Sequence, residues 1–168
     1  MQTISHNKEV IFSYKIFPKC IFLTYYINLP LKKIEKLEKF WLKLGSKVKI
    51  MSFEDHDYVL SLTSHLPHVV AYSIVRTAIN NEDKFKNDVI QYSAGGLRDF
   101  TRIAASDPLM WKDIFLNNKI NLLKITKEFE KSLNLIKNYI KKNNSKKLQE
   151  IFLRTKKIRK LIEKEEQE

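Results

Sequence analysis

The sequence predicts a mainly α-helical protein, in which a short strand-helix-strand piece precedes an all-helical domain ending in a long helical hairpin. Three observations support this fold class. A β-branched and aromatic run lies near the N-terminus, no comparable run follows residue 52, and apolar residues near the C-terminus alternate spacings of three and four. The chain has 168 residues, 43% of them hydrophobic, which is enough for a substantial core.

The strand-helix-strand piece begins with the run KCIFLTYYI at residues 19–27, which Pro18 and the segment Asn28–Pro30 bound. Such a run predicts a buried strand. A helix follows, with Gly45 where a C-terminal cap belongs; its apolar stripe consists of Leu31, Ile34, Leu37, Trp41 and Leu44. Val48–Met51 predicts a second strand. This order is typical of the last part of an α/β sheet, so we predict one domain over residues 1–52 and a helical one over 53–168.

Serine and aspartate mark the expected helix starts in the second domain. Ser52 with Asp55 three residues later matches a capping pattern, and Ser64 is the expected cap of a helix whose first turn holds Pro67. Asp107 followed by proline predicts a further start, which places Trp111 one turn into that helix. From residue 53 onward the sequence predicts no strand.

The C-terminal hairpin is predicted from two apolar stripes. The first consists of Leu122, Thr126, Phe129, Leu133, Ile136 and Ile140, and the second of Leu148, Ile151, Thr155, Ile158 and Ile162. The segment Lys141–Ser145 supplies the turn, with Ser145 as the expected N-cap. A stripe of this kind usually forms core, but a long hairpin on a modest domain is also a common dimer surface, so we expect a homodimer through these helices.

Charge and cysteine content limit the classes of partner. The net charge is +12, which brings nucleic acid and acidic membranes into consideration. The lysines are spread evenly along the chain without interleaved aromatic residues, which favours a solvated surface and leaves a basic nucleic-acid-binding protein as the weakest alternative. No apolar run is long enough to cross a bilayer, so we expect no membrane partner. Cys20 is the only cysteine, which fits a reducing cytoplasm.

Two histidines form the first part of a candidate site. His65 and His68 share one face near the expected helix start at Ser64, where the helix dipole favours a bound anion. The alternatives are a satisfied core histidine or a second cap. A metal site is the poorest interpretation, because no acidic or thiolate third ligand accompanies the pair.

Two glycines and two arginines form the second part. Gly95 and its neighbour Gly96 permit a positive φ or a close approach of the backbone to a ligand. Arg98 and Arg102 follow one helical turn apart. Together with the histidines and Trp111, these guanidinium groups suit a small, flat molecule that bears carboxylates. The alternative for Arg98 is a surface ion pair.

Several catalytic motifs are absent. The chain has only three glycines, at positions 45, 95 and 96, so it holds neither a complete Rossmann fingerprint nor a P-loop. It also lacks a nucleophile elbow and an HExxH zinc motif.

Two long segments carry a family resemblance. EDHDYVLSLTSHLPHVVAYSIV, from Glu54 to Val75, and YSAGGLRDFTRIAASDPLMWKDIF, from Tyr92 to Phe115, closely resemble the C-terminal region of prephenate dehydrogenases. The similarity extends from about residue 17 to about residue 162. It implies a family with an N-terminal Rossmann domain that binds NAD or NADP and a helical domain that binds substrate and forms the homodimer. The implied reaction is oxidative decarboxylation of prephenate to 4-hydroxyphenylpyruvate, in tyrosine biosynthesis.

The resemblance also implies roles for the candidate residues. Arg102 would engage a prephenate carboxylate, with His68 and His65 nearby, Gly95 allowing close approach and Trp111 contributing at the dimer junction. Arg98 would be a weaker, structural candidate.

The family's catalytic histidine lies in an HPxxG-type motif of the nucleotide domain, and this sequence lacks that motif. His6 and His56 have other neighbours. We therefore expect a truncated product, one partner of a split enzyme or a start placed too late, which binds no cofactor and is inactive alone. The alternative is a non-catalytic dimeric module that binds prephenate or an aromatic amino acid, or that docks on a separate nucleotide-binding domain. The choices between NAD and NADP and between prephenate and arogenate stay open.

Overall fold

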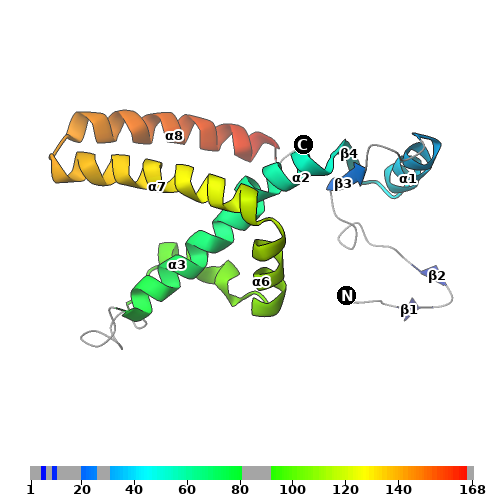
Figure 1. The fold of residues 1–168 in the computed structure, drawn as a ribbon, viewed down its shortest axis with the longest axis horizontal. Coiled ribbons are helices and arrows are strands. Elements are labelled where there is room, and N and C mark those ends of the chain that lie inside the picture. Colours follow the sequence, from blue (N-terminus) through cyan, green and yellow to red (C-terminus); the bar gives the residue numbers. More distant parts are fainter. Residues whose placement is uncertain (1–4, 7–8, 11–19, 26–30, 81–91, 166–168) are drawn as a thin grey trace. The chain divides into compact units, whose positions relative to one another are not determined.

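The computed structural model describes residues 5–6, 9–10, 20–25, 31–80 and 92–165, and these are mainly helical, as predicted. By its internal packing the chain forms two compact units, residues 1–118 and residues 119–168 (Figure 1). This division by packing does not test the domain boundary that we predicted after residue 52, which stays a prediction. None of the described helices is long and apolar enough to span a bilayer.

The predicted strand-helix-strand piece is present in the first unit. Strand β3 (Cys20–Tyr25), helix α1 (Leu31–Lys43) and strand β4 (Lys47–Ser52) follow in order, and the two strands pair in parallel from Cys20 opposite Lys47 to Tyr25 opposite Ser52. Residues 19 and 26–27 of the predicted first strand lie outside the described residues. A short antiparallel pair, β1 (Ser5–His6) with β2 (Glu9–Val10), was not predicted.

Gly45 ends α1 as predicted, with a positive φ of 82°. Its N–H donates to the Leu42 carbonyl at 3.0 Å, and the Ser46 N–H donates to the Trp41 carbonyl at 3.2 Å. This pair of bonds is a Schellman motif, which satisfies the last carbonyls of the helix.

A single long helical run follows β4. It consists of α2 (Phe53–Leu60), the π-helical turn η1 (Ser61–His65) and α3 (Leu66–Asn80), and Figure 1 shows α2 and α3 as one continuous rod. Ser52 caps its start as predicted, because the Ser52 Oγ accepts the Asp55 N–H at 3.1 Å.

The predicted helix start at Ser64 is wrong, because the helix continues through that residue. Pro67 has no N–H to donate, and in a regular α-helix its ring would crowd the carbonyl four residues earlier. The π turn widens the helix just before the proline, with the Leu66 N–H bonded to the Ser61 carbonyl five residues back. His65 and His68 therefore lie in the middle of a helical run, and the helix dipole cannot favour an anion there.

Three short elements pack beside α3. Helix α5 (Gly95–Thr101) and the 3₁₀ turn η2 (Arg102–Ala105) both contact it, and α6 (Pro108–Asn117) follows. The Tyr72 hydroxyl donates to the Ser106 carbonyl at 3.4 Å. Asp107 caps α6 as predicted, since its carboxylate accepts the Met110 N–H at 2.8 Å. Within residues 53–80 and 92–165 every regular element is helical.

The second unit is the predicted antiparallel hairpin of α7 (Lys119–Lys141) and α8 (Ser145–Glu165), which lie side by side in Figure 1. Asn143 adopts a positive φ of 50° in the turn. The N-cap is Asn144 rather than the predicted Ser145: the Asn144 side chain accepts the Lys147 N–H at 3.1 Å, which leaves Ser145 as the first helical residue.

The hairpin leaves much apolar surface in contact with solvent. Leu122 and Ile125 are buried. Many other apolar residues are more than half exposed, including Leu133, Ile140, Phe152, Leu153, Ile158, Leu161 and Ile162. The predicted stripes are thus only partly covered in one chain.

Candidate functional site

Three of the predicted site residues form a ring cluster. His68 on α3 stacks on Trp111 of α6, with ring centroids 3.4 Å apart and planes 20° from parallel. His65 meets the same indole edge-on at 6.2 Å, and Phe115 does so at 5.6 Å. Trp111 is 7% exposed, so these contacts join two helices through a buried aromatic residue.

The hydrogen bond of His68 fixes the position of one proton. Its Nδ1 lies 2.9 Å from the Ser64 carbonyl oxygen, which can only accept, so Nδ1 carries a proton. When the ring is neutral, Nε2 of His68 is therefore a hydrogen-bond acceptor. The bond also holds the imidazole against its own helix, in the orientation that stacks on Trp111.

His65 is a buried, hydrogen-bonded core histidine, which was one of the alternatives predicted for it. It is 8% exposed, and its Nδ1 lies 3.2 Å from Nδ2 of Asn118. Burial lowers the pKa of His65 below its ordinary value of 6.5; nearby Asp57 opposes that change, while His56 and His68 add to it. This lowering favours the neutral form of the His65 ring.

Trp111 carries an unused hydrogen-bond donor. Its Nε1 is buried, and it has no hydrogen-bond partner among the residues that the structure describes. Because leaving a buried N–H unpaired costs about 1–3 kcal/mol, this group is a candidate to pair with an acceptor from outside the chain.

The arginines and glycines lie on the elements that pack against α3. The Arg102 N–H donates to the Arg98 carbonyl, which sets the two residues one helical turn apart, as their spacing predicted. Both side chains are exposed, and no salt bridge joins either of them to another residue in the described ranges. The structure thus gives Arg98 no ion pair with Asp99.

Of the two uses predicted for Gly95 and Gly96, the structure does not show the positive φ. These glycines are the first two residues of α5, and neither has a positive φ, because a helix start needs only ordinary backbone angles. Open space lies beside both residues, since a Cβ atom built at either position meets nothing within 4 Å, and the close approach to a ligand stays a prediction. Room beside the backbone, rather than an unusual φ, is what these glycines provide.

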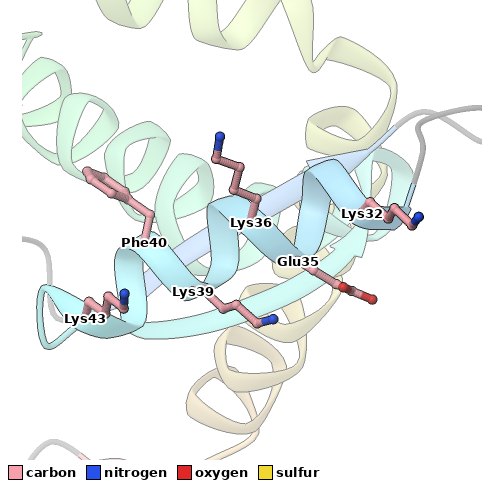
Figure 2. A pocket seen from close by; sticks show the side chains of 6 residues that line it. All are labelled: Lys32, Glu35, Lys36, Lys39, Phe40 and Lys43. Carbon is pink, nitrogen blue, oxygen red and sulfur yellow. The ribbon is translucent and has the colours of Figure 1, made fainter.

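A hollow of about 420 Å³ lies along α1 (Figure 2). None of the predicted site residues lines it. Lys32, Glu35, Lys36, Lys39, Phe40 and Lys43 line it. Figure 2 shows the Lys36 and Lys39 amino groups on opposite sides of the helix, so the lysines do not converge on one point. We interpret this surface as the solvated face of α1.

Sequence reasoning missed Asn118. The residue follows α6, is 8% exposed and contacts His65 across 53 positions of sequence. No local pattern distinguishes it from its exposed neighbour Asn117, so only the tertiary structure identifies it.

Comparisons with known proteins agree with this arrangement. Residues 52–154 match the family model described as prephenate dehydrogenase, dimerization domain. Cyclohexadienyl dehydrogenase of Zymomonas mobilis is 37% identical over 139 residues, which are 83% of this chain and 47% of that protein. Prephenate dehydrogenase of Bacillus subtilis is 35% identical over 133 residues, or 76% of this chain and 36% of that protein.

Solved structures give the same result. Prephenate dehydrogenase of Aquifex aeolicus, in complex with hydroxyphenyl propionate and NAD+, superposes with a TM-score of 0.80 and 41% identity over 85% of this chain and 50% of that one. Synechocystis arogenate dehydrogenase, at 20% identity and a TM-score of 0.78, shares the fold. The chain spans about half the length of these relatives or less. A family model that covers more than half of the chain, together with these relatives, shows that the chain belongs to the prephenate dehydrogenase family and carries its dimerization domain.

Proposed function

We propose that the helical part of this chain binds prephenate or a closely related cyclohexadienyl carboxylate, as the substrate-binding and dimer-forming part of a prephenate dehydrogenase. The observation that carries the proposal is the stack of His68 on the buried Trp111, whose Nε1 lacks a partner among the described residues. A flat ring with polar substituents is the kind of ligand that such a cluster accommodates.

Charge complementarity supports a ligand that bears carboxylates. Arg98 and Arg102 are exposed, take part in no salt bridge within the described residues and stay charged at any physiological pH. In the proposed complex Arg102 pairs with one carboxylate, and Gly95 leaves room for the ligand beside α5. Arg98 contributes charge without a direct contact.

The residues of this chain do not fit a complete dinucleotide site. Such a site needs three closely spaced glycines between a strand and a helix. The connection from β3 to α1 has the sequence YINLP at residues 26–30, without glycine, and none of the strands that the structure describes leads directly into Gly95 and Gly96. We therefore assign no step of hydride transfer to this chain, and we propose that it is inactive alone and acts with a nucleotide-binding domain that binds NAD or NADP.

Self-association through the hairpin is the second part of the proposal. The exposed apolar side chains of α7 and α8 cannot all be covered within a two-helix unit. A hollow of about 380 Å³ on α8 is lined by Ser145, Leu148, Gln149, Phe152, Leu153 and Lys156. A second copy would cover this apolar surface, which matches the description of the family domain. We also propose a cytoplasmic location, since the chain needs no disulfide.

Calorimetric titration of the purified chain with prephenate tests the binding function. Arg102→Ala should weaken binding by about 1.5–3 kcal/mol, or roughly 10- to 150-fold, because a charge-assisted contact to the ligand is lost. Arg76→Ala removes an exposed arginine from α3 outside the proposed site and is the matched control. Equal affinities for Arg102→Ala and the wild type would contradict the assignment, as would the absence of any prephenate binding.

A further inference from the structure

Asn118 joins two helices through one amide group. Its Nδ2 donates to the Asp57 carbonyl oxygen on α2 at 2.7 Å, and the same atom lies 3.2 Å from Nδ1 of His65. Its backbone N–H donates to the Ile114 carbonyl at the end of α6. The residue is therefore held at both its main chain and its side chain.

The contact with Asp57 decides which way the amide points. A backbone carbonyl oxygen only accepts hydrogen bonds, so the group 2.7 Å from it must be the NH₂ of Asn118 and not the amide oxygen. That NH₂ has two protons. One is directed to the Asp57 carbonyl, and the other is available to His65.

The orientation of the amide then decides the tautomer of His65. An NH₂ group at 3.2 Å from Nδ1 requires that this nitrogen accept, which leaves the ring proton on Nε2. A proton on Nδ1, in the other tautomer or in the imidazolium, would face the amide protons directly. Both residues are 8% exposed, so water cannot relieve that clash.

The surroundings of His65 act in the same direction. The titratable groups that influence it are Asp57, which favours protonation, and His56 and His68, which oppose it. Burial outweighs Asp57 and lowers the pKa of His65. His65 is the last residue of the π turn, and its ring lies beside the Asn118 side chain.

We propose that Asn118 is a positioning residue that holds His65 as the neutral Nε2–H tautomer. In the ring cluster, His65 then offers a hydrogen-bond donor, while neutral His68 offers the Nε2 acceptor. The two histidines have opposite polarity, which suits a ligand that presents an acceptor and a hydroxyl. The role in ligand binding rests on the proposed function, whereas the tautomer itself is a property of the free protein.

Long-range ¹H–¹⁵N spectra of the imidazoles in the full chain test the tautomer directly. The chain has four histidines, and the signals lost in His65→Gln assign His65. In the wild type we expect an unprotonated Nδ1 and a protonated Nε2 at pH 7. A protonated Nδ1 or an averaged pair of signals would overturn the proposal, without the need for any Asn118 variant.

Asn118→Asp replaces the donor by an acceptor and should move the proton of His65 to Nδ1 and raise its pKa. Asn117→Asp makes the same change one residue earlier, where the side chain is exposed and donates to the Asp113 carbonyl, and should leave His65 unchanged. Equal His65 spectra in Asn118→Asp and the wild type would overturn the proposal. If Asn118→Asp does not fold, Asn118→Ala, which removes the donor, should give averaged His65 tautomers, and an unchanged Nε2–H signal counts against the role.

Prephenate affinity of the same variants separates this inference from the proposed function. Measured at a pH where the His65 ring is neutral in both variants, Asn118→Asp should bind prephenate at least about tenfold more weakly than Asn117→Asp, because the neutral ring then carries its proton on Nδ1 and offers no donor at Nε2. If the two variants bind prephenate equally well although the His65 tautomer differs between them, the proposed role of Asn118 in ligand binding is overturned. If the wild type binds no prephenate, the proposed function fails, and the spectra still decide whether Asn118 sets the state of His65.

Discussion

Truncating Trp111, which is buried, should destabilise the first unit more than truncating an exposed side chain of α6. The indole is 7% exposed and contacts the rings of His68, His65 and Phe115 with centroids 3.4, 6.2 and 5.6 Å away. Trp111→Ala removes all three contacts and leaves a cavity, which typically costs about 3–5 kcal/mol. Small domains are stable by only about 5–15 kcal/mol, so the variant should lose a large share of its stability.

Two control variants separate the ring from the rest of the helix. Trp111→Phe keeps an aromatic partner for His68, and the N–H that it removes makes no hydrogen bond within the described residues. Its loss of unfolding free energy should therefore be roughly half that of Trp111→Ala or less. Leu109→Ala truncates a neighbouring side chain that is 62% exposed and should change stability by about 0.5 kcal/mol or less.

Urea denaturation followed by circular dichroism measures these differences. The protein concentration must be the same for every variant, because self-association would shift the midpoint. A loss below about 1 kcal/mol for Trp111→Ala, or a loss for Trp111→Phe as large as that for Trp111→Ala, would refute the reasoning that the stacked indole joins α3 to α6.

Four further outcomes follow from the structure. Asp107→Ala should cost about 0.5–2 kcal/mol in the same denaturation assay, because the N-cap bond to Met110 is lost, whereas Asp113→Ala removes only a surface pair and should stay within about 0.5 kcal/mol. Stability should fall as the pH drops below the ordinary histidine pKa of 6.5, because the lowered pKa of His65 makes the unfolded state bind the proton more readily; denaturation midpoints of His65→Gln should show less of this dependence. Gly45→Ala should lower the free energy of unfolding by about 1 kcal/mol, because Gly45 has a φ of 82°. Gly96→Ala should raise that free energy by up to about 1 kcal/mol, because Gly96 lies in a helix with open space at its Cβ position; a lower stability of Gly96→Ala would contradict that open space. Prephenate binding, measured by calorimetry, should weaken as salt shortens the Debye length from about 30 Å at 0.01 M to about 3 Å at 1 M, and salt-independent binding would contradict a role for the arginine charges.

Local chemistry explains which parts of the fold could be predicted from the sequence. Gly45 ends α1 and Asp107 begins α6 because each acts within a few residues of its own position. Apolar spacing is equally local, and it predicted both α1 and the hairpin of α7 with α8. Each of these features depends on the backbone groups or the side-chain face of one element, so one sequence is sufficient.

Pro67 shows where local chemistry permits two structures. A serine followed three residues later by proline fits a helix start, and it also fits a helix that widens to admit the proline. The choice depends on whether the preceding turns are stabilised by packing. Here α2 contacts both strands and α3 contacts α5 and η2, so the helix is supported on both sides of the proline and continues. The contacts with β3, α5 and η2 come from segments farther away in the sequence, so no local pattern indicates them.

The candidate site combines two kinds of residue whose roles differ in how far they could be predicted. Arg98 and Arg102 keep their charge in any surroundings, so their contribution follows from residue type alone. The histidines are different, because burial and Asn118 determine whether His65 is a cation, a donor or an acceptor. In the proposed complex, the arginines attract a carboxylate ligand and the ring cluster orients it. A net charge of +12 adds attraction for any anion, so discrimination between anions must come from the directional hydrogen bonds of the ring cluster.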